Sequence, residues 1–196
     1  MELYAPATSA DRYATFWRIS NTLLARLNRS RLATVAAIRG ACPAGGCCLS
    51  LCCDHRVMTA AGSIGLNEVL LGIPVPKYWG ALMARVIGLS AADRLLQRGA
   101  MVNPQEALRL GLVDEVVEPS SLLARAEAAM QGLLRVPSQA RALTKVNMRG
   151  DFCAEWEAFC VEEAVGAWAM LESPSVQGAI KRYLDRLSAA AKQAKL

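Results

Sequence analysis

The sequence predicts an α/β fold that continues into an all-helical C-terminal part. Two short apolar runs, TVAAI at 34–38 and HRVMTA at 55–60, are typical of buried strands. A Gly-rich turn and a short helix candidate separate them, so strand, turn, helix and strand follow one another within about thirty residues. Beyond Pro76 nearly every segment shows the spacing of an amphipathic helix. With 196 residues the chain is long enough to bury a core of its own.

The helices before Pro76 are assigned by periodicity. Residues 10–28 predict an amphipathic helix whose apolar stripe consists of Tyr13, Phe16, Trp17, Leu24 and Leu27. We expect this stripe to belong to the core rather than to a cofactor site. The run CCLSLCCD at 47–54 predicts a short buried helix between the two strands.

The segments after Pro76 carry start and stop signals. YWGALMARVI predicts one helix at 78–87. The next helix is expected to begin at Ser90 as N-cap, with Asp93 in a position like that of a capping box, and to end at Gly99.

In NPQEALRLG, Asn103 is the expected cap, Pro104 the first helical residue and Gly111 the stop. LVDEVVEP at 112–119 predicts a short strand. The remaining helices are expected at about 120–133, 137–149, 152–171 and from Ser173 onward. We therefore divide the chain into 1–120, which mixes strands and helices, and 121–196, which is helical.

Composition narrows the class of function. Hydrophobic residues make up 54% of the chain, and the mean hydropathy is +0.24. Such a chain buries surface in an oligomer or has a hydrophobic cleft. No apolar run is long enough to span a membrane. Basic patches interleaved with aromatic residues are absent, so no nucleic-acid partner is expected.

The formal net charge is +5, with some concentration of basic residues near the C-terminus. Two interpretations stay open for this excess. It is either a solvated helix face or an attraction for an anionic ligand, such as the phosphate-bearing tail of a cofactor.

Seven cysteines are present, five of them within residues 42–53. We expect free, buried thiols in a reducing compartment, because no secretory signal is visible at the N-terminus. Spaced C-x-x-C pairs are absent and His55 is the sole histidine, so no metal site is expected.

A lone carboxylate, Glu68, stands in the otherwise apolar stretch SIGLNEVLLGIP at 63–74. Glutamate is rarely buried without a partner, so one interpretation is an exposed turn residue beside Asn67. The other is a catalytic base in an apolar pocket, where desolvation raises the pKa toward the working pH.

The run CPAGGC at 42–47 puts two glycines where a strand turns into a helix. Glycine permits close backbone approach, and the first N–H groups of a helix have no intrahelical acceptor. The turn is therefore a purely structural connection, an oxyanion hole or an anion site. An oxyanion donor near a single base suits proton abstraction next to a thioester carbonyl, through an enolate.

The run AAIRGACPAGGCCLSLCCDHRVMTAAGSIGLNEVLLGIP resembles the enoyl-CoA hydratase/isomerase (crotonase) superfamily. Within it, the run is most similar to the Δ3,Δ2-enoyl-CoA isomerases (dodecenoyl-CoA isomerases) of the mitochondrial type. IGLSAADRLLQRG, PQEALRLGLVDEVV and a late LTK match that family in order and spacing. The resemblance implies a ClpP/crotonase-like spiral of short strands and helices at 1–120, which carries the active site, and a helical region at 121–196 that builds a homotrimer.

The resemblance also implies roles for single residues. The N–H of Gly45 would hold the thioester oxygen, and Glu68 would carry the proton from C2 to C4. Asn67 matches a substrate-contacting position, and the cleft near Leu66, Ile73 and Pro74 would be apolar enough to keep the pKa of Glu68 high. The implied reaction converts 3-cis or 3-trans enoyl-CoA to 2-trans enoyl-CoA in β-oxidation, with acyl-CoA as substrate and no metal or redox cofactor.

Hydratases of the superfamily carry a second glutamate, at the position that Cys48 occupies here. One carboxylate is enough to move a proton but does not offer two bases to activate a water molecule. The resemblance and this chemistry together favour an isomerase over a hydratase.

Members of the family begin with strands that we expect this chain to lack, including a motif like F-S-A-G-x-D-L that supplies a second oxyanion N–H. Three alternatives remain open. The chain is a shortened form of an active isomerase, an inactive subunit that oligomerises, or an enzyme that draws the second donor from another segment.

Two signals bear on localisation. The family resemblance points to the mitochondrial matrix. The terminal residues Ala194, Lys195 and Leu196 resemble the peroxisomal S-K-L signal and so point to the peroxisomal matrix.

Overall fold

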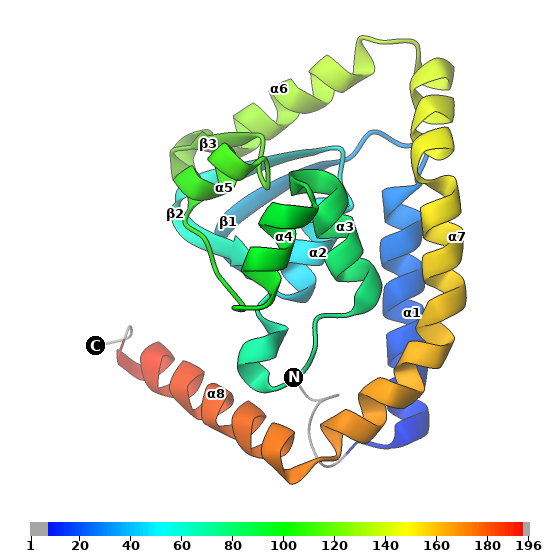
Figure 1. Ribbon diagram of the computed structural model, residues 1–196. Helices are drawn as coiled ribbons and strands as arrows, with labels where there is room; N and C mark the ends of the chain where they lie inside the picture. Colours follow the sequence, from blue (N-terminus) through cyan, green and yellow to red (C-terminus); the bar gives the residue numbers. More distant parts are fainter. Residues whose placement is uncertain (1–7, 194–196) are drawn as a thin grey trace.

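The computed structural model describes the backbone of residues 8–193 and the side chains of residues 8–186. A parallel sheet of three strands, in the order β1-β2-β3, lies at the centre (Figure 1). Its strands are β1 (Val35–Pro43), β2 (His55–Gly65) and β3 (Glu115–Val117). The expected α/β class with a helical C-terminal part is confirmed.

Strands β1 and β2 run further than the two apolar segments predicted. They pair from Val35↔His55 to Pro43↔Gly65, with an irregularity between Ile38 and Gly40. Past this irregularity the two backbones approach each other closely, and a Cβ at Gly62 would collide with the carbonyl of Gly40. Glycine at position 62 therefore allows the pairing to continue to the end of both strands.

Eight α-helices surround the sheet in the described part of the chain: α1 (Ala10–Asn28), α2 (Gly45–Leu51), α3 (Lys77–Ile87), α4 (Leu89–Leu96), α5 (Pro104–Leu110), α6 (Leu122–Leu134), α7 (Ser138–Leu171) and α8 (Pro174–Gln193). Two short 3-10 helices, η2 (Glu68–Leu71) and η3 (Pro119–Ser121), complete the fold. The expected cap of α5 is confirmed, because the Asn103 side chain accepts a hydrogen bond from the N–H of Glu106 and Gly111 adopts a left-handed conformation.

Two sequence predictions about helices were wrong. Helix α4 begins at Leu89 with Gly88 at the N-cap, and the Ser90 hydroxyl instead accepts a hydrogen bond from Arg94 at 2.7 Å. The segments 137–149 and 152–171 form the single helix α7, which passes through Gly150. A glycine inside a helix costs only about 1 kcal/mol, and buried residues of α7 on both sides of it outweigh that cost.

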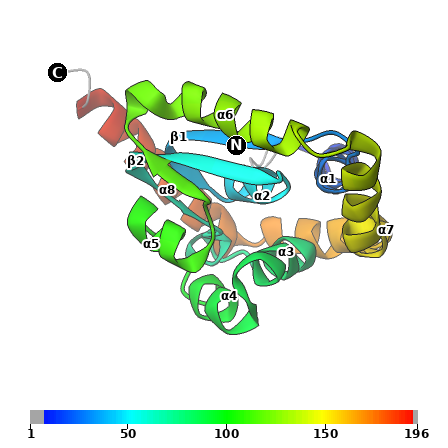
Figure 2. The same cartoon turned by 90° about the horizontal axis from the view of Figure 1, so that it is seen from above.

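The helices cover both faces of the sheet. Helix α6 lies on one side of it, while α3, α4 and α5 lie on the other (Figure 2). Val57 of β2 is buried against Leu122 and Ala126 of α6. Helix α7 runs along α1 (Figure 1), and the main core joins residues from every α-helix except α6 in one cluster. The division at residue 120 stays a prediction.

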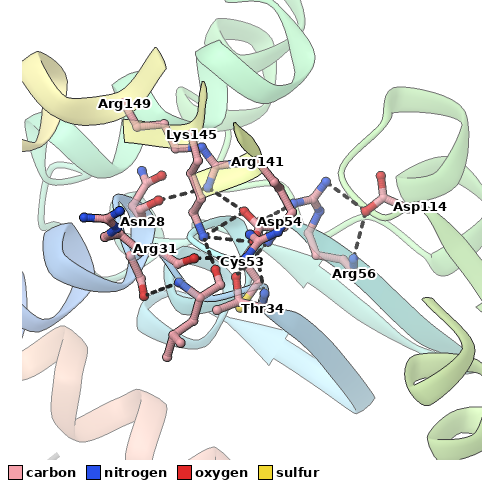
Figure 3. Close-up of polar contacts among 12 residues, drawn as sticks. Asn28, Arg31, Thr34, Cys53, Asp54, Arg56, Asp114, Arg141, Lys145 and Arg149 are labelled. Atoms are coloured by element: carbon pink, nitrogen blue, oxygen red, sulfur yellow. Dashed lines mark hydrogen bonds and ion pairs between the residues drawn. The ribbon is translucent and has the colours of Figure 1, made fainter. Parts of the chain in front are cut away.

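Polar contacts around Asp54 attach α7 to the start of the sheet (Figure 3). The Asp54 carboxylate accepts hydrogen bonds from the N–H and hydroxyl of Thr34 and forms ion pairs of 2.9 Å with Lys145 and 3.0 Å with Arg149. The Lys145 ammonium also donates to the carbonyl of Leu32. The cluster fixes one end of α7, whose other end carries residues of the site.

Candidate functional site

The ends of β1 and β2 bring the Gly-rich turn and the segment around Glu68 together. Parallel strands end at the same edge of a sheet, and Pro43 pairs with Gly65 at that edge. The N–H of Ala44 donates a 2.9 Å hydrogen bond to the carbonyl of Gly65. The two motifs that the sequence analysis singled out therefore leave the sheet side by side.

The Gly-rich turn presents the first N–H groups of α2. Ala44, at the N-cap, has φ 51° and ψ −124°, a conformation that favours glycine. Holding an alanine there costs about 1–3 kcal/mol, and strain of this kind is concentrated at functional sites. Helix α2 begins at Gly45 and has no side-chain cap, so the Gly45 N–H is a donor without an intrahelical acceptor.

Glu68 is the first residue of η2 and is 8% exposed. Neither of its carboxylate oxygens has a hydrogen-bond partner within the described residues. Burial raises the pKa of Glu68 to about 7 from its ordinary 4.5, and a weak contact with its own backbone N–H offsets only part of that rise. The interpretation of Glu68 as an exposed turn residue is wrong, and the desolvated carboxyl is suited to accept and return a proton near neutral pH.

A cavity of about 700 Å³ opens beside Glu68. Four of the residues that the sequence singled out lie on its wall: Gly45, Glu68, Ile73 and Pro74. The wall is mostly apolar, which is the environment that keeps Glu68 desolvated. Such a cavity has the size and character of a small-molecule site.

Leu66 and Asn67 lie away from the cavity wall. Leu66 is 1% exposed and belongs to the core, and neither residue is among those that line the cavity. Asn67 is 9% exposed and its carbonyl accepts a hydrogen bond from the N–H of Leu70. Their predicted role in substrate contact stays a prediction, and Asn67 stands at the N-cap of η2.

The sequence analysis missed the aromatic wall of the cavity. Its rings come from three helices distant in sequence: Tyr13, Phe16, Trp17, Trp79 and Phe159. The stripe on α1 was expected to be core, and Tyr13, Trp17 and Leu24 are indeed buried, but they also line the cavity. Trp17 and Trp79 are stacked, with ring centroids 5.8 Å apart.

Two further carboxylates line the cavity, Glu162 and Glu163. Glu163 accepts hydrogen bonds from the indole N–H of Trp17 at 3.2 Å and from the N–H of Lys77 at 2.8 Å. Burial raises the pKa of Glu163, and these two donors oppose that rise. Glu162 is exposed, so Glu68 alone of the three combines burial with an unbonded carboxylate.

All seven cysteines are free. Cys48 is fully buried, and burial raises the pKa of its thiol well above the ordinary value. Within residues 8–193, no three His, Cys, Asp or Glu side chains gather closely enough to hold a metal ion. No helix in the same range is long and apolar enough to cross a membrane.

The fold and the site together define a chain of the crotonase type. The family model described as enoyl-CoA hydratase/isomerase matches residues 3–193, and the chain belongs to that family. A solved structure, human mitochondrial Δ3-Δ2-enoyl-CoA isomerase, superposes with a TM-score of 0.89 at 35% identity. The match covers 94% of this chain and 72% of that one.

Two curated relatives are similar over nearly the whole chain. Mouse mitochondrial enoyl-CoA delta isomerase 1 is 38% identical over 189 residues, which is 95% of this chain and 65% of the relative. The human protein of the same name is 36% identical over 181 residues, 91% of this chain and 60% of the relative. The chain thus spans somewhat less than two thirds of the length of these relatives.

Proposed function

We propose that the chain acts as a Δ3,Δ2-enoyl-CoA isomerase that converts 3-cis or 3-trans enoyl-CoA to 2-trans enoyl-CoA in fatty-acid β-oxidation. The observation that carries the proposal is the Glu68 carboxyl, buried on the wall of an apolar cavity without a hydrogen-bond partner in the described part of the chain. The similarity to proteins named as enoyl-CoA delta isomerases supports the same assignment.

The proposed reaction needs one base and one oxyanion donor. The Glu68 carboxylate removes a proton from C2 of the 3-enoyl thioester, the electron pair of that C–H bond forms a C1–C2 double bond, and the carbonyl π pair moves onto the thioester oxygen. The N–H of Gly45 donates a hydrogen bond to the resulting enolate. The Glu68 carboxyl then returns the proton to C4 as the enolate collapses, which leaves the double bond between C2 and C3.

A hydratase is the alternative reaction on the same fold. It needs a second base, and the position at which hydratases carry one is Cys48. That thiol is fully buried, is absent from the cavity wall and has a raised pKa, so it remains neutral near pH 7. The site therefore favours proton transfer by one carboxyl over activation of water.

The test is a pair of assays on the purified chain. With a 3-enoyl-CoA, the conjugated 2-enoyl product should form. Its ultraviolet absorbance measures the rate. With a 2-enoyl-CoA and no 3-enoyl-CoA, no 3-hydroxyacyl-CoA should form, and mass spectrometry distinguishes that hydrated product from the 3-enoyl-CoA made by the reverse isomerisation. Formation of 3-hydroxyacyl-CoA in the second assay, without isomerisation in the first, would support a hydratase. A folded chain without turnover in either would support a non-catalytic subunit of an oligomer.

Substrate and assembly complete the proposal. CoA enters only as part of the acyl-CoA substrate, and no separate cofactor is required. We propose a homotrimer, supported by large apolar side chains that are exposed in the single chain, such as Leu89 and Val165. Sedimentation equilibrium should then give three times the mass of one chain, and a single-chain mass would contradict the trimer.

For localisation we propose the mitochondrial matrix, which the names of the relatives support. The peroxisome is the competing site. Its signal, Ala194-Lys195-Leu196, lies outside the described residues. Imaging of the chain with and without these three residues in cells tests the choice, because loss of a peroxisomal pattern on their removal would overturn the mitochondrial assignment.

A further inference from the structure

A buried side chain, Asn21 of α1, joins three helices behind the cavity. It is fully buried, and its side-chain N–H donates a 2.9 Å hydrogen bond to the carbonyl of Trp17. Its oxygen accepts hydrogen bonds from the indole N–H of Trp79 on α3 and of Trp156 on α7, each at 2.9 Å. One amide oxygen thus accepts from two buried indole N–H groups. Without it, each would be an unpaired buried donor that destabilises the fold.

Trp79 connects this amide to the site. Its ring lies on the cavity wall, and a Cβ added at Gly45 would be 3.5 Å from its Cη2 atom and 3.9 Å from its Cζ3 atom. A methyl group at position 45 would therefore touch the edge of this ring, so the ring lies beside the residue whose N–H is the proposed oxyanion donor. The opposite edge, which carries the indole N–H, is held by Asn21.

We propose that Asn21 is a positioning residue that acts through Trp79 on the oxyanion site at Gly45. The inference rests on the proposed isomerase function. With its indole N–H held, the Trp79 ring stays beside Gly45 and keeps water from the N–H that meets the enolate. Exclusion of water strengthens a hydrogen bond to a developing negative charge, and a small displacement at such a site costs one to two orders of magnitude in rate.

The second indole on Asn21 supplies a matched control. Trp156 donates to the same oxygen over the same distance, but it lies in the core and does not line the cavity. If Asn21 is purely structural, loss of either indole hydrogen bond should affect kcat equally. If Asn21 positions Trp79, only loss of the bond to Trp79 should lower kcat.

The experiment measures kcat, KM and thermal unfolding for the wild type, Asn21→Leu, Trp79→Phe, Trp156→Phe and the double variant Asn21→Leu/Trp79→Phe. We expect kcat to fall about 10-fold in Asn21→Leu and in Trp79→Phe. Trp156→Phe should lower the unfolding temperature but change kcat by less than about 2-fold. In the Trp79→Phe background, Asn21→Leu should lower kcat by less than about 2-fold, because the contact is already absent.

Asn21→Asp provides a rescue. It retains an oxygen for both indoles, so its kcat should stay within about 3-fold of the wild type in whatever fraction folds. Should Asn21→Leu not fold, a fall of kcat in Trp79→Phe but not in Trp156→Phe supports the inference, and equal effects overturn it.

The failures of the two proposals are distinguishable. A wild type without turnover of 3-enoyl-CoA overturns the proposed function and this inference with it. An active wild type whose Asn21→Leu variant keeps its kcat, or loses it to the same extent with and without Trp79, overturns the inference alone.

Discussion

Asp54 and Glu68 are two carboxylates in the same chain, both largely buried, and their surroundings are opposite. Asp54 lies between Thr34, Lys145 and Arg149, with two cations within 3.0 Å of it (Figure 3). Glu68 faces an apolar cavity, and its carboxylate has no hydrogen-bond partner within residues 8–186. Asp54 follows α2, just before the start of β2, and Glu68 follows the end of β2, so one strand separates the two environments.

The difference separates a structural charge from a reactive one. Hydrogen-bond donors and cations use the lone pairs of Asp54, so this side chain fixes the position of α7. Glu68 retains its lone pairs, and its pKa is raised to about 7 by desolvation. A carboxyl in that state exchanges a proton readily near neutral pH, at the expense of stability when it ionises.

The largest expected effect is on turnover. Glu68→Gln keeps the shape of the side chain but removes the base, so kcat should fall about 10³-fold. Because no partner is lost, the unfolding temperature at pH 8 should stay the same or rise. Steady-state kinetics and calorimetry on one sample measure both. A variant that retains more than a tenth of the wild-type kcat would contradict the role of Glu68 as the base.

The matching change at the other carboxylate should have the opposite result. Asp54→Asn leaves the ammonium of Lys145, whose side chain is only 6% exposed, without its counter-charge. Removing one partner of a buried ion pair costs about 3–5 kcal/mol of unfolding free energy. Urea unfolding measures this loss, and kcat of the folded fraction should change less than about 3-fold.

Glu106→Gln is the control for Asp54→Asn, because Glu106 pairs with Arg109 on an exposed face of α5. It should leave the unfolding midpoint unchanged. Equal effects of the two variants would show that the pairing of Asp54 adds no stability.

The motifs of the site were predictable, because their residues are close together in sequence. CPAGGC and the segment around Glu68 lie on either side of one strand, so local pattern placed both Gly45 and Glu68. The aromatic wall was not predictable in the same way. Asn21 and Trp156 are 135 residues apart, and no local pattern indicates that an asparagine on α1 accepts from indoles on α3 and α7.

The pairing of Asp54 shows the same limit, since Lys145 lies 91 residues further along the chain. Tertiary packing also decided the two helix boundaries that sequence signals placed wrongly. Ser90 has the chemistry of an N-cap, but α4 starts one residue before it. Gly150 has the chemistry of a helix breaker, but α7 is held on both sides of it by buried residues such as Lys145 and Cys153.

The pH dependence sharpens the contrast between the two carboxyls. The pKa of Glu68 rises from 4.5 to about 7 on folding, so between these values the folded chain holds a proton that the unfolded chain has released. The contribution of Glu68 to the free energy of unfolding is fully present below pH 4.5. It is lost as the pH rises through 7, by about 3 kcal/mol in total. Glu68→Gln should remove this loss, so its stability relative to wild type should increase from pH 4 to pH 8.

The same titration should govern activity in the opposite sense. Only the ionised carboxylate accepts the proton from C2, so kcat/KM should rise with pH around a midpoint of about 7. A midpoint near 4.5 would mean that Glu68 is solvated in the working enzyme and that the cavity does not desolvate it.

The smallest expected effect tests how much the Thr34 hydroxyl beside Asp54 contributes to the free energy of unfolding. Thr34→Val removes the hydroxyl that donates to the Asp54 carboxylate at 3.1 Å and accepts from the Asp54 N–H. The Thr34 N–H, both cations and the 2.9 Å bond from the Asp54 N–H to the Thr34 carbonyl remain. The unfolding free energy should fall by about 1 kcal/mol, and kcat should not change. Thr15→Val on the exposed side of α1 is the control and should change stability by less than about 0.5 kcal/mol. A loss for Thr34→Val as large as that for Asp54→Asn would mean that the hydroxyl, rather than the cations, stabilises the buried carboxylate.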